Sequence, residues 1–122
     1  MTTTDPTPVL DPARVDELCT MLGDQATLLS LLEEFVAELA PKLEEMRTGL
    51  REGDAQVIDR AAHTVRGTGA NLGAAAVSAA ASELESRARE ERLDGIAPLL
   101  TRLETEVWRL HQLLGNGGLR EL

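Results

Sequence analysis

Apolar side chains recur at three- and four-residue spacing through most of this 122-residue chain. The clearest example is formed by Leu28, Leu32, Phe35, Val36, Leu39, Leu43, Met46 and Leu50. This spacing is the period of one face of an α-helix, and no segment shows the alternation that is typical of a strand. The pattern therefore predicts an all-α protein.

Glycine, proline and aspartate residues divide the apolar pattern into five segments, and we expect each segment to be a helix. The expected helices cover residues 12–22, 24–50, 54–70, 74–91 and 94–115. Asp11, Asp24 and Asp54 stand at the starts of three of them, where a carboxylate can cap free backbone N–H groups. Pro41 interrupts the second helix, which either kinks there or divides into two segments near Ala40. We expect a kink, because the apolar phase continues beyond the proline.

Four substantial helices joined by short links are typical of an antiparallel four-helix bundle. The helix over 12–22 is short, and we expect it to be an additional N-terminal helix that caps the bundle. The segment 74–91 is rich in alanine, whose small side chain lets a neighbouring helix approach closely. We expect residues 12–115 to form the bundle, residues 1–11 a flexible lead-in, and residues 116–122 a C-terminal tail.

The charge of the chain limits the partners that it can bind. Twelve basic residues stand against 21 acidic ones, which gives a formal net charge of −9. Such a charge argues against nucleic acid and against an anionic membrane surface, since both are bound through Lys and Arg. We see no signal peptide and no apolar stretch long enough to span a membrane. We therefore expect a cytoplasmic protein.

The third expected helix carries a histidine away from its apolar stripe. On a helical wheel of about 100° per residue, the stripe centres near Ile58 and Val65, and His63 lies about 140° from Ile58. The residues around this histidine on the open face are Asp59, Arg60, Gly67 and Ala70, with Arg66 at the margin. We therefore expect an exposed imidazole beside one acid, two arginines and two very small residues.

Two glycines, Gly67 and Gly69, follow His63 in the same helix. Glycine in a helix interior costs about 1 kcal/mol relative to alanine, so its presence needs a reason. We interpret both glycines as residues that keep the surface beside His63 open, so that a second molecule can reach the ring.

An exposed histidine with an arginine three residues later is a suitable combination for phosphoryl transfer. Near neutral pH an imidazole has a free lone pair with which it can attack a phosphoryl group. The guanidinium of Arg66, three residues after His63, is within reach to neutralise the charge that the phosphoryl group brings. Because the chain has no glycine-rich nucleotide loop, we expect it to exchange phosphate with another protein rather than to use ATP.

Other kinds of site have less support. His63 and His111 are the only histidines and Cys19 is the only cysteine, so a metal site of the His/Cys type lacks ligands. We expect the acidic pairs Glu33-Glu34, Glu44-Glu45 and Glu90-Glu91 to lie on solvent-exposed helix faces and not to form a site. No nucleophile-elbow pattern supports a Ser-His-Asp arrangement. We expect His111 to be structural or solvent-exposed, and Cys19 to be a buried, inert thiol.

The segment from His63 to Ala74 reads His63-Thr-Val-Arg-Gly67-Thr-Gly-Ala-Asn71-Leu72-Gly73-Ala74. It closely resembles the signature of histidine-containing phosphotransfer (HPt) domains, which runs histidine, any residue, an aliphatic, lysine, glycine, two small residues, then Asn-Leu-Gly-Ala or similar. The length of the chain and the order of its helices fit this family too, over about residues 10–115.

The resemblance implies a phosphorelay intermediate and not an enzyme with its own ATP site. His63 would take a phosphoryl group from an aspartate of a response-regulator receiver domain and pass it to another, reversibly. Gly67 would clear space for the active site of the receiver. The resemblance implies no cofactor on this chain, while the receiver is expected to use Mg²⁺.

The chain departs from the family pattern at Arg66, where lysine is usual. The charge is kept, but a planar fork replaces a mobile point charge. We expect Arg66 to support the phosphate on His63, with Arg60 on the same face sharing this work, and we expect the substitution Arg66→Ala to speed loss of phosphate. Asp59 would mildly oppose phosphorylation by repulsion.

The expected partners are receiver domains, together with a hybrid histidine kinase, and the chain is expected to be a monomer. We expect a locally basic contact patch that includes Arg60, Arg66, Gly67 and Ala70, with exposed apolar side chains of the helix over 24–50. The alternative is a helical docking module that binds a receiver or kinase without being phosphorylated. A kinase phosphoacceptor dimer is a third interpretation, but it needs a dimerising hairpin and an attached ATP domain.

Overall fold

The structure, a computed structural model, describes residues 7–117, and every regular element in that range is an α-helix. The helices are α1 (Pro12–Leu22), α2 (Gln25–Glu52), α3 (Ala55–Leu72), α4 (Ala75–Arg89) and α5 (Ile96–Gly115). The prediction of an all-α chain with five helices is confirmed, and the ends of the helices differ from the expected ones by two residues at most.

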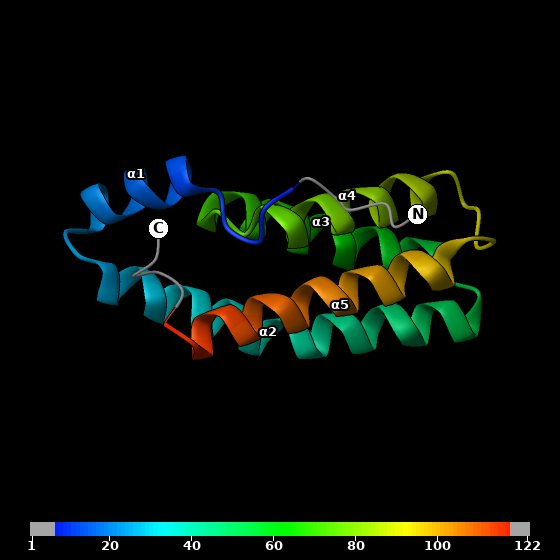
Figure 1. The fold of residues 1–122 in the computed structure, drawn as a ribbon. Coiled ribbons are helices and arrows are strands. Elements are labelled where there is room, and N and C mark those ends of the chain that lie inside the picture. Colours follow the sequence, from blue (N-terminus) through cyan, green and yellow to red (C-terminus); the bar gives the residue numbers. More distant parts are fainter. Residues whose placement is uncertain (1–6, 118–122) are drawn as a thin grey trace, which may run out of the picture.

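The four long helices form a closed bundle in which each helix packs against two others. Figure 1 shows α2 and α5 side by side in the lower half of the view, with α3 and α4 side by side above them. The ring is completed by contacts of α2 with α3 and of α4 with α5. The short α1 extends along one end of the bundle and contacts α2 and α3.

Local capping explains why the helices begin where they do. The carboxylates of Asp11, Asp24 and Asp54 accept hydrogen bonds from the backbone N–H groups of Ala13, Thr27 and Val57, at 3.1, 2.7 and 3.3 Å. Each bond satisfies a donor that has no partner within its own helix. The three N-caps predicted from the sequence are therefore confirmed.

The turn between α3 and α4 fixes how the helix that carries His63 meets its neighbour. Gly73 ends α3 with a left-handed backbone, φ +82°, which residues with a side chain rarely adopt. Its carbonyl accepts from the backbone N–H of Asp11 at 2.9 Å, and Arg14 Nε donates to the carbonyl of Asn71 at 3.1 Å. The start of α1 is thereby tied to the end of α3.

The second helix continues through Pro41 without a break, so the alternative of two separate helices is excluded. Pro41 lies on the exposed side of α2, whereas Leu39 and Leu43 on either side of it are buried. The apolar side of the helix therefore keeps its phase on both sides of the proline, which is the reason for expecting one helix.

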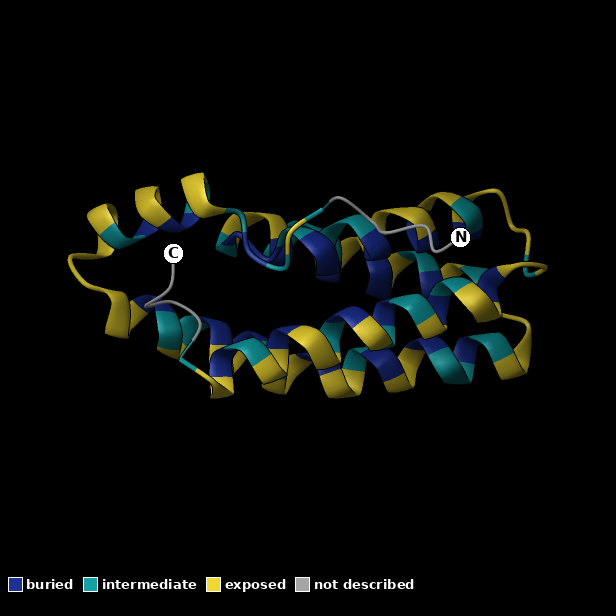
Figure 2. Cartoon of the chain, in the orientation of Figure 1, coloured by how far each residue is buried: buried dark blue, intermediate teal, exposed yellow. Residues whose placement is uncertain are grey.

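Aliphatic side chains from all five helices fill the core. Figure 2 shows the buried residues as dark blue segments that recur along the helices. Phe35 is the one aromatic member of the core among the described residues, and Trp108 is 62% exposed on α5. Leu10, just before α1, is also buried. The expected lead-in over 1–11 and tail over 116–122 lie partly outside the described residues, and the division of the chain stays a prediction.

None of the helices described between residues 7 and 117 combines the length and the apolar character that crossing a membrane requires.

Candidate phosphoryl-transfer site on helix α3

Helix α3 buries one side and presents His63 on the other. Its buried residues are Ile58, Ala61, Ala62, Val65 and Gly69. The side chain of His63 is 60% exposed, so the ring lies off the core face as the helical wheel predicts. Asp59, Arg60 and Ala70 also lie on the open sides of this helix, with Asp59 only half exposed.

A buried carboxylate on the neighbouring helix holds the imidazole. Glu85 of α4 has only 6% of its side chain exposed, and its Oε2 lies 2.6 Å from His63 Nδ1. A charge so deeply buried is costly unless it is paired and hydrogen-bonded. Glu85 meets that condition, because three side chains converge on it.

Two arginines complete the shell of Glu85. Arg66 Nε donates to Glu85 Oε1 at 2.5 Å, and Arg89 Nη2 donates to Oε2 at the same distance. Arg66 also brings its Nη2 to 3.1 Å from His63 Nδ1. The main chain of Arg66 is tied to α4 as well, since Ser78 Oγ donates to its carbonyl at 2.9 Å. The prediction that Arg66 comes within reach of His63 matches this geometry.

The surroundings of Glu85 keep it ionised. Burial acts to raise its pKa, but hydrogen bonds from Arg66 and His63, with the charges of Arg66 and Arg89, outweigh burial and hold the pKa below its ordinary value. An ionised carboxylate can only accept hydrogen bonds, so His63 Nδ1 must carry the proton in the bond between them. In that tautomer the contact of Arg66 Nη2 with Nδ1 is not a hydrogen bond, because both atoms are donors.

The same tautomer leaves the lone pair of the ring on Nε2. In a ring that is 60% exposed and held through Nδ1, Nε2 is therefore the nitrogen whose lone pair is not protonated. The sequence alone does not distinguish the two ring nitrogens, whereas this geometry does.

A shallow depression of about 440 Å³ lies beside the ring. It is lined by Asp59, Arg60, His63, Thr64 and Arg89. Two guanidinium groups therefore border the space next to the imidazole, and this gives Arg60 the location that the sequence suggested. Asp59 contributes the only carboxylate of this lining.

The two glycines of α3 have different environments. A Cβ atom added at Gly67 would meet no atom within 4 Å outside its own helix backbone, so the surface there is open. One added at Gly69 would lie 3.4 Å from Phe35 Cζ and 3.5 Å from Ser78 Cβ. The interpretation of Gly69 as a residue that opens the surface is wrong, because this position is buried between α2 and α4 and serves their packing.

Neither Glu85 nor Arg89 was predicted from the sequence to belong to the site. A signal for Glu85 exists, since it falls at the edge of the apolar stripe of α4, between the buried Ala81 and Ala88. A carboxylate in such a position calls for a partner, but the sequence does not say which helix supplies it.

One part of the predicted contact patch is wrong, namely the exposed apolar side chains expected on the second helix. The large apolar side chains of α2 are buried or half-buried, and the exposed ones among the described residues are Met21 and Leu22 of α1 and Trp108 of α5. The reason is that α2 packs against α1, α3 and α5, which together cover its apolar positions.

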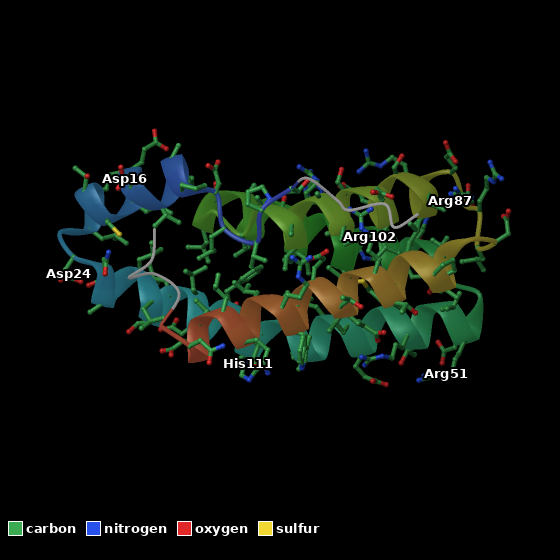
Figure 3. All side chains as sticks on the ribbon, viewed as in Figure 1. Asp16, Asp24, Arg51, Arg87, Arg102 and His111 are labelled. Carbon is green, nitrogen blue, oxygen red and sulfur yellow. The ribbon has the colours of Figure 1, made fainter. Side chains whose placement is uncertain are left out.

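His111, the other histidine, is exposed on α5 and lines a depression against Glu33, Val36 and Ala37 of α2. Figure 3 shows it on α5 beside α2. Among residues 7–117, no group of three or more His, Cys, Asp or Glu side chains is placed to hold a metal ion.

Comparisons with known proteins identify the family of this chain. The family model of the Hpt domain matches residues 30–114, which include all of α3 and α4. Among solved structures, the histidine-containing phosphotransfer protein B (HptB) of Pseudomonas aeruginosa PAO1 is similar, with a TM-score of 0.83 and 28% identity over 93% of this chain and 96% of that chain. No curated protein matches. The chain belongs to the Hpt domain family, and histidine phosphotransfer in a phosphorelay with response-regulator receivers is its role.

Proposed function

We propose that His63 is the residue that carries the phosphoryl group, accepting it from the aspartate of a receiver domain and passing it to another receiver. One observation carries this assignment. The exposed ring of His63 is held through Nδ1 by the buried Glu85, which leaves the lone pair of Nε2 unprotonated, and the surface at Gly67, one turn on, is open.

Transfer to this chain is a displacement at phosphorus. The Nε2 lone pair forms a bond to phosphorus while the bond between phosphorus and the aspartyl oxygen breaks, and the aspartate leaves as a carboxylate. In the reverse direction a receiver carboxylate attacks phosphorus, the N–P bond breaks, and the imidazole leaves as a neutral ring. No proton has to leave Nδ1 in either direction.

Glu85 acts on this reaction through the ring. Bond formation at Nε2 gives the imidazole a positive charge, and the ionised carboxylate 2.6 Å from Nδ1 stabilises that charge. The same bond fixes the tautomer and the plane of the ring, so that Nε2 is ready to attack without rearrangement. Glu85 is therefore a positioning residue, because it acts on the phosphoryl group only through His63.

The basic residues around the ring balance the charge of the phosphoryl group. Arg66 lies three residues after His63, and Arg60 lines the depression next to the ring. Each offers several N–H donors to phosphoryl oxygens. Gly67 and the exposed Ala70 leave room on this face of α3 for the receiver.

The remaining parts of the proposal concern the setting of the reaction. We propose that the chain draws its phosphate from a partner and not from ATP, that it holds no cofactor of its own, and that Mg²⁺ enters with the receiver. Receiver domains and a hybrid histidine kinase are the proposed partners. The protein is proposed to act as a monomer in the cytoplasm.

A phosphotransfer assay tests the assignment of His63. A receiver domain charged with labelled phosphate is mixed with the native chain, with the variant His63→Gln, and with the variant His111→Gln. His111 is the matched control, because the chain has only these two histidines. We expect acid-labile, base-stable label on the native chain and on His111→Gln, and none on His63→Gln.

Two other outcomes of this assay would refute the proposal. Label that persists on His63→Gln would refute the assignment of this residue. If no receiver from a panel labels the native chain but one of them still binds it, the protein is a docking module and the proposal fails.

A further inference from the structure

Arg89 lies between two carboxylates that belong to different helices. It follows Glu85 by one turn of α4, and its Nη2 donates to Glu85 Oε2 at 2.5 Å. The same nitrogen lies 3.6 Å from Oδ1 of Asp59, which precedes His63 by one turn of α3. Glu85 Oε2 is also the oxygen that His63 Nδ1 contacts, so the guanidinium stands next to the ring.

One carboxylate oxygen of Asp59 lacks a hydrogen bond in this arrangement. Its Oδ1 is buried and has no hydrogen-bond partner in the part of the chain that the structure describes. Within that part, Arg89 is the one cation in ion-pair range of Asp59. A buried carboxylate oxygen without a hydrogen bond favours any movement that brings a donor closer. Asp59 therefore attracts Arg89, while Glu85 holds the guanidinium by a full hydrogen bond.

The position of Arg89 matters because it also borders the place where a phosphoryl group would lie. Arg89, Asp59 and His63 all line the depression of about 440 Å³ beside the ring. With 64% of its side chain exposed, Arg89 has room to turn towards phosphoryl oxygens in that space if it gives up contacts with the carboxylates. A guanidinium that already has carboxylate partners binds a new anion more weakly, because it must give up part of its existing interactions.

We infer that Asp59 is a positioning residue that competes with the phosphoryl group for Arg89 and thereby shifts the phosphotransfer equilibrium away from His63 and towards the receiver aspartate. This inference rests on the proposed function, since it assumes that His63 carries phosphate. Arg89 is the group that touches the phosphoryl oxygens, and Asp59 acts through it.

The expected effect of Asp59 on the phosphotransfer equilibrium can be estimated from the strength of its ion pair with Arg89. Ion pairs with exposed partners contribute about 0.2–1 kcal/mol, and 1.4 kcal/mol corresponds to a factor of ten in an equilibrium constant. Removing the charge of Asp59 should therefore raise the equilibrium constant for phosphate on His63 by about 1.4- to fivefold. The isosteric substitution Asp59→Asn does this with the least change in packing.

A double-mutant cycle tests the inference. The equilibrium constant for phosphate exchange with one receiver is measured for the native chain, Asp59→Asn, Arg89→Gln and the double variant. We expect Asp59→Asn to raise the share of phosphate on His63 in the native background and to have no effect in the Arg89→Gln background. Asp16→Asn makes the same charge change on α1, which Figure 3 shows at the other end of the bundle from Arg87 of α4. It should leave the equilibrium unchanged.

Each contrary result overturns the inference. An equal effect of Asp59→Asn with and without Arg89 would show direct repulsion between Asp59 and the phosphoryl group. A lower share of phosphate on His63 would show that Asp59 delivers Arg89 to the phosphoryl group instead of competing with it, and no change would remove its role altogether. Failure of the native chain to accept phosphate is a separate result, which refutes the proposed function. Unfolding curves of all variants identify any that are misfolded.

Discussion

Gly67 offers the sharpest test of how a partner reaches His63, because stability and transfer should change in opposite directions when it is replaced. A Cβ at this position meets no atom within 4 Å outside its own helix backbone, so Gly67→Gln introduces no clash within the chain. Replacing a helical glycine by a good helix former stabilises the helix by about 0.5–1 kcal/mol. For a domain of this size we expect the melting temperature to rise by about 2–6 °C.

Transfer from a receiver should become slower in the same variant. The new side chain lies one turn after His63, on the surface that the active site of the receiver must cover. Overfilling a fitted contact costs about 1–3 kcal/mol. Since 1.4 kcal/mol is a factor of ten, kcat/KM for transfer should fall by about five- to 140-fold.

The assay compares Gly67→Gln with Gly69→Ala, a matched glycine replacement in the same helix. A Cβ at Gly69 lies 3.4 Å from Phe35 Cζ, an ordinary contact distance, so this variant should fold, and it should transfer phosphate at the native rate. Both variants are also phosphorylated with phosphoramidate, a small donor that needs no docking. We expect this donor to charge Gly67→Gln as fast as the native chain.

Two results would refute the reasoning about access. Transfer from the receiver to Gly67→Gln at the native rate would mean that the partner does not cover this surface. Slow charging of Gly67→Gln by phosphoramidate would mean that the substitution disturbs His63 itself. In that case the lost rate says nothing about docking.

Three further predictions concern the charge network and the core. Arg66→Ala should shorten the half-life of phosphate on His63 by about fivefold, the equivalent of about 1 kcal/mol, and an unchanged half-life would exclude the role of Arg66. Glu85→Gln should lower the free energy of unfolding at pH 7 by about 1–3 kcal/mol, because a buried, charge-assisted network is lost. Since the folded-state pKa of Glu85 is lowered, its stabilising effect is present above the unfolded pKa of about 4.3 and disappears as the pH falls through the lower folded value. Urea unfolding of the native chain and of Glu85→Gln at pH 7 and pH 3 should therefore show a smaller difference in unfolding free energy at pH 3. An equal difference at both pH values would contradict the lowered pKa of Glu85. Ile58→Ala, at a fully buried position, should cost about 2–5 kcal/mol in the same measurement, and a loss below 1 kcal/mol would contradict its place in the core.

Much of this molecule follows from local properties of the sequence. The helix ends follow from aspartate caps and glycine stops, because these interactions involve residues no more than a few positions apart. The exposure of His63 follows in the same way, since the periodicity of one helix decides which of its side chains face the core. Arg66 is one turn from His63, so its proximity to the ring was also within reach of the sequence.

Predictions from the sequence were wrong where the environment of a residue depends on a neighbouring helix. Gly67 and Gly69 look alike in the sequence, yet one faces open space and the other is packed beside Phe35 and Ser78. Periodicity gives the direction in which a residue points, but not what stands opposite it. For the same reason the large apolar side chains of α2, which were expected to be exposed, are buried or half-buried.

The helical fold, the exposed histidine and the family signature were determined by the sequence itself, because each depends on short-range order along the chain. Only the tertiary structure decided how that histidine is held. Glu85 lies 22 residues after His63, and Arg89 stands between Glu85 and Asp59, so their meeting depends on the register of α4 against α3. The Gly73 turn and the packing of Gly69 lie where α3 and α4 meet, but a contact between two helices leaves no periodic signal in the sequence.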